Sequence, residues 1–133
     1  MISIIKLLTK ILNYLKTTQL TLTRENNPYV SATYFARLTA YRKSGILFLR
    51  GNLTLSAAMP NETTDITIGT ITGWSAMHTV LLTVPSQYNG TNVVLVQIST
   101  DGIISLYNVS GTTLPANTFY RFQAAVPMND LDM

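Results

Sequence analysis

The order of apolar and polar residues changes along the chain from a helical period to a period of two. Residues 1–16 place apolar side chains three and four positions apart, which predicts an amphipathic helix. From residue 31 onward, short runs of alternating residues predict strands, with turn signals between them. We therefore expect residues 1–18 to form a helix, 19–30 a connector and 31–133 a separate head.

The clearest strand signal is residues 93–109, in which two apolar runs flank Asp101-Gly102. Asp-Gly favours a type I′ turn, because both central residues of that turn need positive φ. With such a turn, Val96 would face Tyr107, and both faces of the hairpin would be mostly apolar. This pattern predicts a hairpin in the centre of a sandwich, or one whose second face contacts another subunit.

The other strands are expected where the chain alternates between Gly-, Pro- and Asn-containing turns. Turns that recur every eight to twelve residues are typical of an antiparallel β-sandwich. We therefore predict a mainly β chain with a jelly-roll-like sandwich head and a short N-terminal α-helix. The expected strands are residues 31–43, 46–56, 64–71, 79–84 and 118–126.

The apolar face of the N-terminal helix covers about four positions in seven, which is wider than a two-stranded seam and suits a trimer or a groove in a partner. Lys6 and Lys10 interrupt the apolar run, so a secretory signal and a membrane span are both disfavoured. A helix lying on a membrane surface remains an alternative. We favour packing against the head or against symmetry mates. The residues expected to make oligomer contacts are Ile4, Ile5, Leu8, Ile11, Leu12 and Leu15.

Composition and charge restrict the partners. The 133 residues fit one domain, and 47% hydrophobic content with only 11% charged residues suits a protein that hides surface in an assembly. The net charge of +3 comes from Lys6, Lys10 and Lys16, because the six other basic residues balance the six acidic ones. A formally neutral head predicts no nucleic-acid partner. The chain has no cysteine, which excludes disulfides and thiolate metal sites.

Groups suited to catalysis are scarce. Glu62 and Asp65 lie three positions apart in a loop, where their carboxylates need not converge, and His78 has no acid near it in sequence. The chain has no phosphate-binding loop, nucleophile elbow or metal-ligand spacing. We therefore expect no enzymatic activity, no metal and no cofactor.

Carbohydrate binding is the other chemistry considered. A tryptophan between glycine and serine offers a platform for a sugar ring, although it equally fits a plug at the end of a sandwich. The polar loop after residue 86 offers side chains that can bond sugar hydroxyls, although such loops are also ordinary turns. The candidate ligand-binding residues are Trp74, His78, Tyr88, Asn89 and Asn92.

Four segments resemble the C-terminal heads of bacteriophage tail-fibre and receptor-binding proteins. They are NLTLSA (52–57), DITIGTI (65–71), VQISTDGIISLYN (96–108) and LPANTFYRFQAAVP (114–127). The resemblance covers roughly residues 45–127 and consists of strand patterns. It implies a homotrimer of β-sandwich heads on a helical stalk, displayed as a surface appendage of a virion. It also implies that the head binds host cell-surface carbohydrate and that the helix docks to other virion proteins.

The part of the chain before the head departs from that family. Tail fibres usually carry a sizeable N-terminal region that docks to the tail, whereas about thirty residues precede the head here. The alternative is a capsid decoration or head-fibre protein, with an anchoring role and no ligand.

Overall fold

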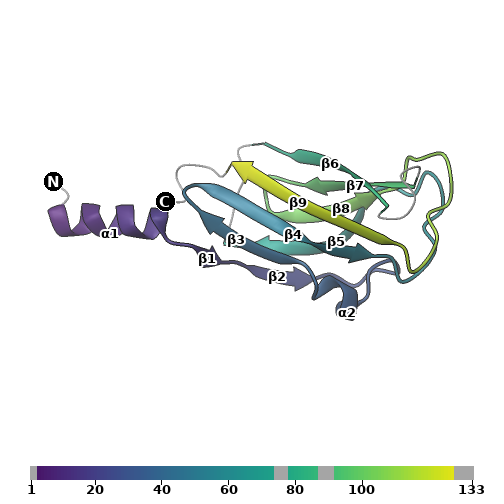
Figure 1. Ribbon diagram of the computed structural model, residues 1–133, viewed down its shortest axis with the longest axis horizontal. Helices are drawn as coiled ribbons and strands as arrows, with labels where there is room; N and C mark the ends of the chain where they lie inside the picture. Colours follow the sequence, from purple (N-terminus) through teal and green to yellow (C-terminus); the bar gives the residue numbers. More distant parts are fainter. Residues whose placement is uncertain (1–2, 74–77, 87–91, 128–133) are drawn as a thin grey trace.

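Two antiparallel β-sheets pack face to face in the computed structural model, which describes residues 3–73, 78–86 and 92–127 (Figure 1). The chain folds as a β-sandwich with a short N-terminal helix, which confirms the predicted fold class. The elements in chain order are α1 (Ile4–Leu15), β1 (Thr18–Gln19), β2 (Thr21–Arg24), α2 (Ala32–Phe35), β3 (Thr39–Lys43), β4 (Ile46–Thr54), β5 (Ile66–Thr72), β6 (Val80–Pro85), β7 (Val93–Ile98), β8 (Ile103–Tyr107) and β9 (Phe119–Pro127).

The first sheet has the strand order β1-β3-β4-β9 and the second has the order β2-β5-β8-β7-β6. The paired strands β6–β7, β5–β8 and β4–β9 enclose one another along the chain, as in a jelly roll. Strands β6, β7 and β8 follow one another in the sheet, and β5 pairs with β8, which makes a Greek key. The chain passes from the first sheet to the second between β1 and β2, while β6 lies alongside β9 at the opposite edge. The stretch expected as a connector, 19–30, thus contains strand β2 of the sandwich.

The core fills the space between the two sheets. Strand β4 shows how it is built, because Leu47, Leu49 and Leu53 point inward and are fully buried, whereas Arg50 between them is exposed. β9 repeats the alternation around its buried Tyr120. β4 and β9 therefore each give one face to the core and the other to solvent.

The predicted strand 31–43 is wrong in its first half. Residues 32–35 form the single turn of α2, and only Thr39–Lys43 is extended. Ser31 caps this turn, because its Oγ accepts a hydrogen bond from the backbone N–H of Tyr34 at 3.3 Å. The alternation that predicted a strand relied on alanine, the residue with the highest helix propensity, so a capped turn competes well with it.

The turn between β7 and β8 is not of type I′. Of its two central residues only Gly102 has positive φ, at 80°. The Ser99 carbonyl accepts a hydrogen bond from Gly102 N–H at 3.0 Å, and Ser99 N–H donates to the Ile103 carbonyl at 3.0 Å. The Ser99 hydroxyl also accepts from the N–H groups of Asp101 and Ile103. These bonds hold a three-residue loop with glycine in the left-handed position, another common hairpin connection.

The extra loop residue moves the register of β8 by one position. Val96 pairs with Leu106, and Leu95 pairs with Tyr107, so the predicted facing of Val96 and Tyr107 is wrong. Because side chains alternate, the shift turns Leu106 into the core and leaves Tyr107 half-buried on the outside. The hairpin nonetheless occupies the centre of the five-stranded sheet, as its apolar content predicted.

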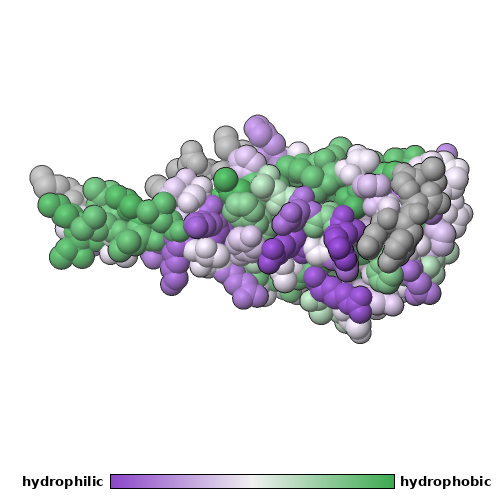
Figure 2. All heavy atoms as spheres, viewed as in Figure 1, coloured by the Kyte–Doolittle hydropathy of each residue, from purple (hydrophilic) through white to green (hydrophobic). Residues whose placement is uncertain are grey.

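Helix α1 extends away from the sandwich (Figure 1). None of its residues is buried, so of the two packings expected for it, the one against its own head is wrong, and packing against symmetry mates stays a prediction. Its attachment is at its C-terminal end, where the Tyr14 carbonyl accepts a hydrogen bond from Ser44 N–H at 2.8 Å and the Tyr14 ring lies against Gly45. Its surface is largely apolar in Figure 2.

Tyr120 is fully buried, and its hydroxyl has no hydrogen-bond partner among the described residues. Burial raises its pKa to about 12, because the phenolate would lose its hydration. The unfolded chain releases this proton near pH 10, about two units earlier than the folded protein. Relative to its value below pH 10, the free energy of unfolding therefore falls as the pH rises from 10 toward 12, because only the unfolded chain ionises this tyrosine in that range.

We expect Tyr120→Phe to raise the free energy of unfolding by about 1 kcal/mol at pH 7, because it removes an unpaired buried hydroxyl. The variant should also lose less stability than the wild type between pH 10 and pH 12. Urea unfolding followed by tryptophan fluorescence measures both effects, and Tyr41→Phe on the outer face is the control. A destabilised Tyr120→Phe protein at pH 7 would show that the hydroxyl has a partner.

Candidate functional site

The ligand-binding residues proposed from the sequence are only partly described. Trp74, Tyr88 and Asn89 lie outside the described residues. His78 is exposed two positions before β6, and Asn92 is half-buried directly before β7. Because β6 and β7 are antiparallel, these two residues lie at opposite ends of a six-residue strand, about 20 Å apart. The structure does not bring His78 and Asn92 into one site.

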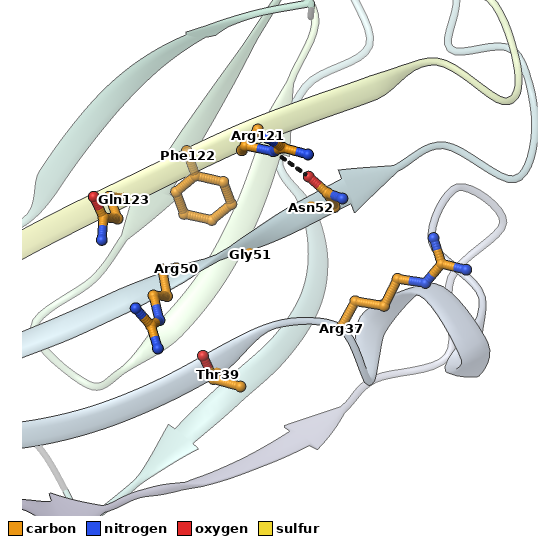
Figure 3. A pocket seen from close by; sticks show the side chains of 8 residues that line it. All are labelled: Arg37, Thr39, Arg50, Gly51, Asn52, Arg121, Phe122 and Gln123. Carbon is orange, nitrogen blue, oxygen red and sulfur yellow. Dashed lines mark hydrogen bonds between the residues drawn. The ribbon is translucent and has the colours of Figure 1, made fainter.

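A groove on the outer face of the four-stranded sheet is the better candidate (Figure 3). The last paired residues of β3 and β4 are Thr39 and Arg50. Beyond them, β4 is paired only with β9, and the groove forms at the edge that β3 has left. Its volume of about 880 Å³ is within the range of ligand sites. We call it the arginine groove; it is lined by Arg37, Thr39, Arg50, Gly51, Asn52, Arg121, Phe122 and Gln123.

Three arginines from separate segments surround this groove (Figure 3). Arg37 precedes β3, Arg50 lies in β4 and Arg121 lies in β9. They belong to different elements, so it is the folded sheet that brings them to one place. A guanidinium group is always charged at physiological pH and presents five N–H donors.

The contacts of these arginines are with neutral groups. The Nε–H of Arg121 donates to Asn52 Oδ1 at 3.2 Å. The guanidinium of Arg37 lies 5.2 Å from the centre of the Tyr34 ring, and that of Arg50 lies 5.9 Å from the centre of the Tyr41 ring. Such contacts orient the side chains, and none of these partners, all of them described residues, carries a negative charge that would compensate the guanidinium groups.

An aromatic pair extends the groove along the sheet. Tyr41 and Phe48 stack with ring centres 5.1 Å apart. They line a second, smaller hollow of about 220 Å³, which shares Arg50 and Gln123 with the arginine groove. The outer face therefore joins charged, polar and aromatic surface in one continuous strip.

Gly51 brings the backbone before β3 close to β4. Its φ is 153°, and a Cβ at this position would lie 2.6 Å from the carbonyl oxygen of Arg37. A larger residue would push away the segment that carries Arg37. The glycine thus sets the width of the groove at this point.

Charge is separated between the two sheets. The strands of the four-stranded sheet contain no Asp or Glu, and β3 adds Lys43 to the outer face that carries the groove arginines, whereas Arg42 pairs with the inward-facing Leu47 and lies on the other face of β3. In the described part of the chain, the acidic residues lie around the five-stranded sheet, in its loops or directly after β2; they are Glu25, Glu62, Asp65 and Asp101. The formal neutrality of the head therefore conceals a basic face, which sequence reasoning missed.

The two acidic residues considered from the sequence have different contacts in the structure. Asp65 accepts a hydrogen bond from the Tyr107 hydroxyl at 3.2 Å, whereas the backbone N–H of Glu62 donates to the Asn108 carbonyl. Desolvation raises the pKa of Tyr107, and the nearby charge and hydrogen bond of Asp65 raise it further. Within the described ranges, no three His, Asp or Glu side chains gather as metal ligands. Neither described helix has the length and apolar character needed to cross a membrane.

Gly51→Ala should lower the free energy of unfolding by about 3 kcal/mol, because the methyl group meets backbone and the positive φ becomes strained. Gly111→Ala is the matched control, since Gly111 has φ of 88° but open space around its Cβ position. We expect the control to cost about 1 kcal/mol, from strain alone. Urea unfolding compares the two, and equal losses would contradict a close approach at Gly51.

Comparison with known proteins adds no relative to this description. No protein-family model matches the chain, and a search of curated proteins found no significant match. The arginine groove and helix α1 are therefore the features that bear on function.

Proposed function

We propose that this protein is a non-enzymatic attachment module of a virion, in which α1 joins three copies and the sandwich heads bind host-surface carbohydrate. The observation that carries this proposal is the exposure of the large apolar residues of α1, none of which is buried. The six residues expected to make oligomer contacts are 45% to 77% exposed in the single chain. They are Ile4, Ile5, Leu8, Ile11, Leu12 and Leu15.

The geometry of α1 supports assembly through this helix. Twelve residues give about 18 Å of helix, which is too short to be stable alone in water. Ser3 caps its first turn by accepting a hydrogen bond from Lys6 N–H at 3.1 Å, but a cap contributes only about 1 kcal/mol. Burial of its apolar face in an interface would supply the missing stabilisation.

The width of the apolar face supports a trimer. At 100° per residue, the large apolar residues of α1 cover half of the helix circumference, whereas Lys6, Thr9, Lys10 and Asn13 occupy the other half. Two helices in a simple seam would leave part of such a face in water, and three helices cover it better. The resemblance of the strand segments to phage fibre heads supports the same arrangement and the location on a virion.

The content of the arginine groove supports a binding role. Its lining, which lies wholly within the described residues, contains neither a carboxylate nor an imidazole. It supplies guanidinium, amide and hydroxyl groups, which recognise a ligand but do not transfer its protons at neutral pH. Three such sites on one rigid assembly raise avidity by orders of magnitude over a single site.

We expect the full-length chain to be a trimer by light scattering and the variant Leu8→Gln/Ile11→Gln to be a monomer. Glutamine keeps the helix propensity of these positions but removes the apolar contact. The matched control is Lys6→Gln/Lys10→Gln, which places the same residue on the polar half of α1 and should remain a trimer.

A monomeric wild-type chain would overturn the assembly role. In that case, binding of the chain to vesicles of phosphatidylglycerol, lost in Leu8→Gln/Ile11→Gln, would identify α1 as a helix that lies on a lipid surface. A wild-type trimer that persists in Leu8→Gln/Ile11→Gln would place the subunit interface on the sandwich instead.

A further inference from the structure

We propose that the arginine groove selects acidic saccharides, that is, sugars that carry a carboxylate, sulfate or phosphate group. This inference names the ligand class of the proposed attachment role and rests on that role. It also moves the binding site from the loops considered in the sequence to the outer face of the four-stranded sheet.

The arginines carry the preference for an anion. Arg37, Arg50 and Arg121 enter one groove from three segments, and their contacts are with two aromatic rings and one amide. A planar guanidinium forms paired hydrogen bonds with carboxylate, sulfate and phosphate oxygens. An anion in the groove would supply the counter-charge that these neutral neighbours do not.

The rest of the lining carries the preference for a sugar. Asn52, Gln123 and Thr39 offer amide and hydroxyl groups that can donate to and accept from sugar hydroxyls. Phe122, whose half-buried ring lies between β9 and β4 and packs against the core, closes the floor of the groove (Figure 3). The volume of about 880 Å³ exceeds what an inorganic anion needs and leaves room for several sugar units.

The amount of charge argues against a nucleic acid. Proteins that bind duplex DNA commonly neutralise about six to ten phosphates. Here three cations line the groove, and Lys43 lies farther along the same face. This number fits a saccharide with one acidic group per unit or fewer. The separation of charge between the sheets would orient such a ligand toward the basic face.

Isothermal titration with matched saccharides tests the proposal. The probes are a galacturonic acid hexamer, its fully methyl-esterified form, a sulfated hexasaccharide, a phosphorylated hexasaccharide and the oligonucleotide dT12. We expect at least one of the three acidic glycans to bind the wild-type chain, and the methyl ester to bind at least tenfold more weakly than the galacturonate. The strongest of the three identifies the acidic group.

The groove variant is Arg37→Gln/Arg50→Gln, and it should weaken binding of the strongest acidic probe by at least tenfold. Lys6→Gln/Lys10→Gln removes the same number of charges from α1 and should bind within twofold of the wild type. Circular dichroism verifies the fold of both variants. In the wild-type chain, ¹⁵N shifts of the arginine Nε groups should move on addition of the ligand, which tests the site without a substitution.

Three results would overturn the proposal: no binding of any acidic glycan, equal binding of the acid and its methyl ester, or tighter binding of dT12. Equal loss of affinity in the two variants would also overturn it, because it would show a general effect of charge. The mass measured by light scattering does not depend on these titrations. A trimer that binds no acidic glycan therefore rejects the ligand and leaves the assembly role intact.

Discussion

The ladder between β4 and β9 is the constraint on which both the core and the arginine groove depend. It aligns nine residues, Ile46–Thr54 with Phe119–Pro127, without a shift in register. One face of the ladder supplies Leu53 and Tyr120 to the core, and the other presents Asn52 and Arg121 to the groove. A slip by one residue would exchange the two faces and place charge in the core. The burial that stabilises the sandwich therefore also fixes the chemistry of its surface.

Local patterns in the sequence predicted most of the fold, and their failures have local causes. The strands β4 to β9 follow runs of alternating or β-branched residues, and they were found at nearly their observed bounds. The sequence pattern did not distinguish a two-residue from a three-residue turn at Asp101-Gly102, because the outcome depends on hydrogen bonds from the Ser99 hydroxyl. It also missed α2, where a serine cap outweighs a weak alternation of alanines.

The arginine groove could not be predicted from local sequence patterns, for a different reason. Arg50 and Arg121 are 71 positions apart in sequence, and only the pairing of β4 with β9 brings them together. A count of charges after residue 16 sets six basic residues against six acidic ones and returns zero, wherever they lie on the two sheets. The sequence does show that both arginines alternate with core residues and so point outward from their strands. This identifies a shared site only once the strand order is known.

The tether between Tyr14 and the β3–β4 hairpin has a mechanical consequence. Helix α1 continues through residues 16–17 into β1, which pairs with β3, and it also contacts the sandwich at Ser44 and Gly45, whereas the groove lies about 20 Å farther along β4. A ligand held in the groove and an assembly that holds α1 would pull on opposite ends of the same strands. That force acts along the strands, so the hydrogen bonds of the β3–β4–β9 ladders share the load in shear and do not open one after another. Such an arrangement withstands tension far better than a sheet pulled apart from its edge.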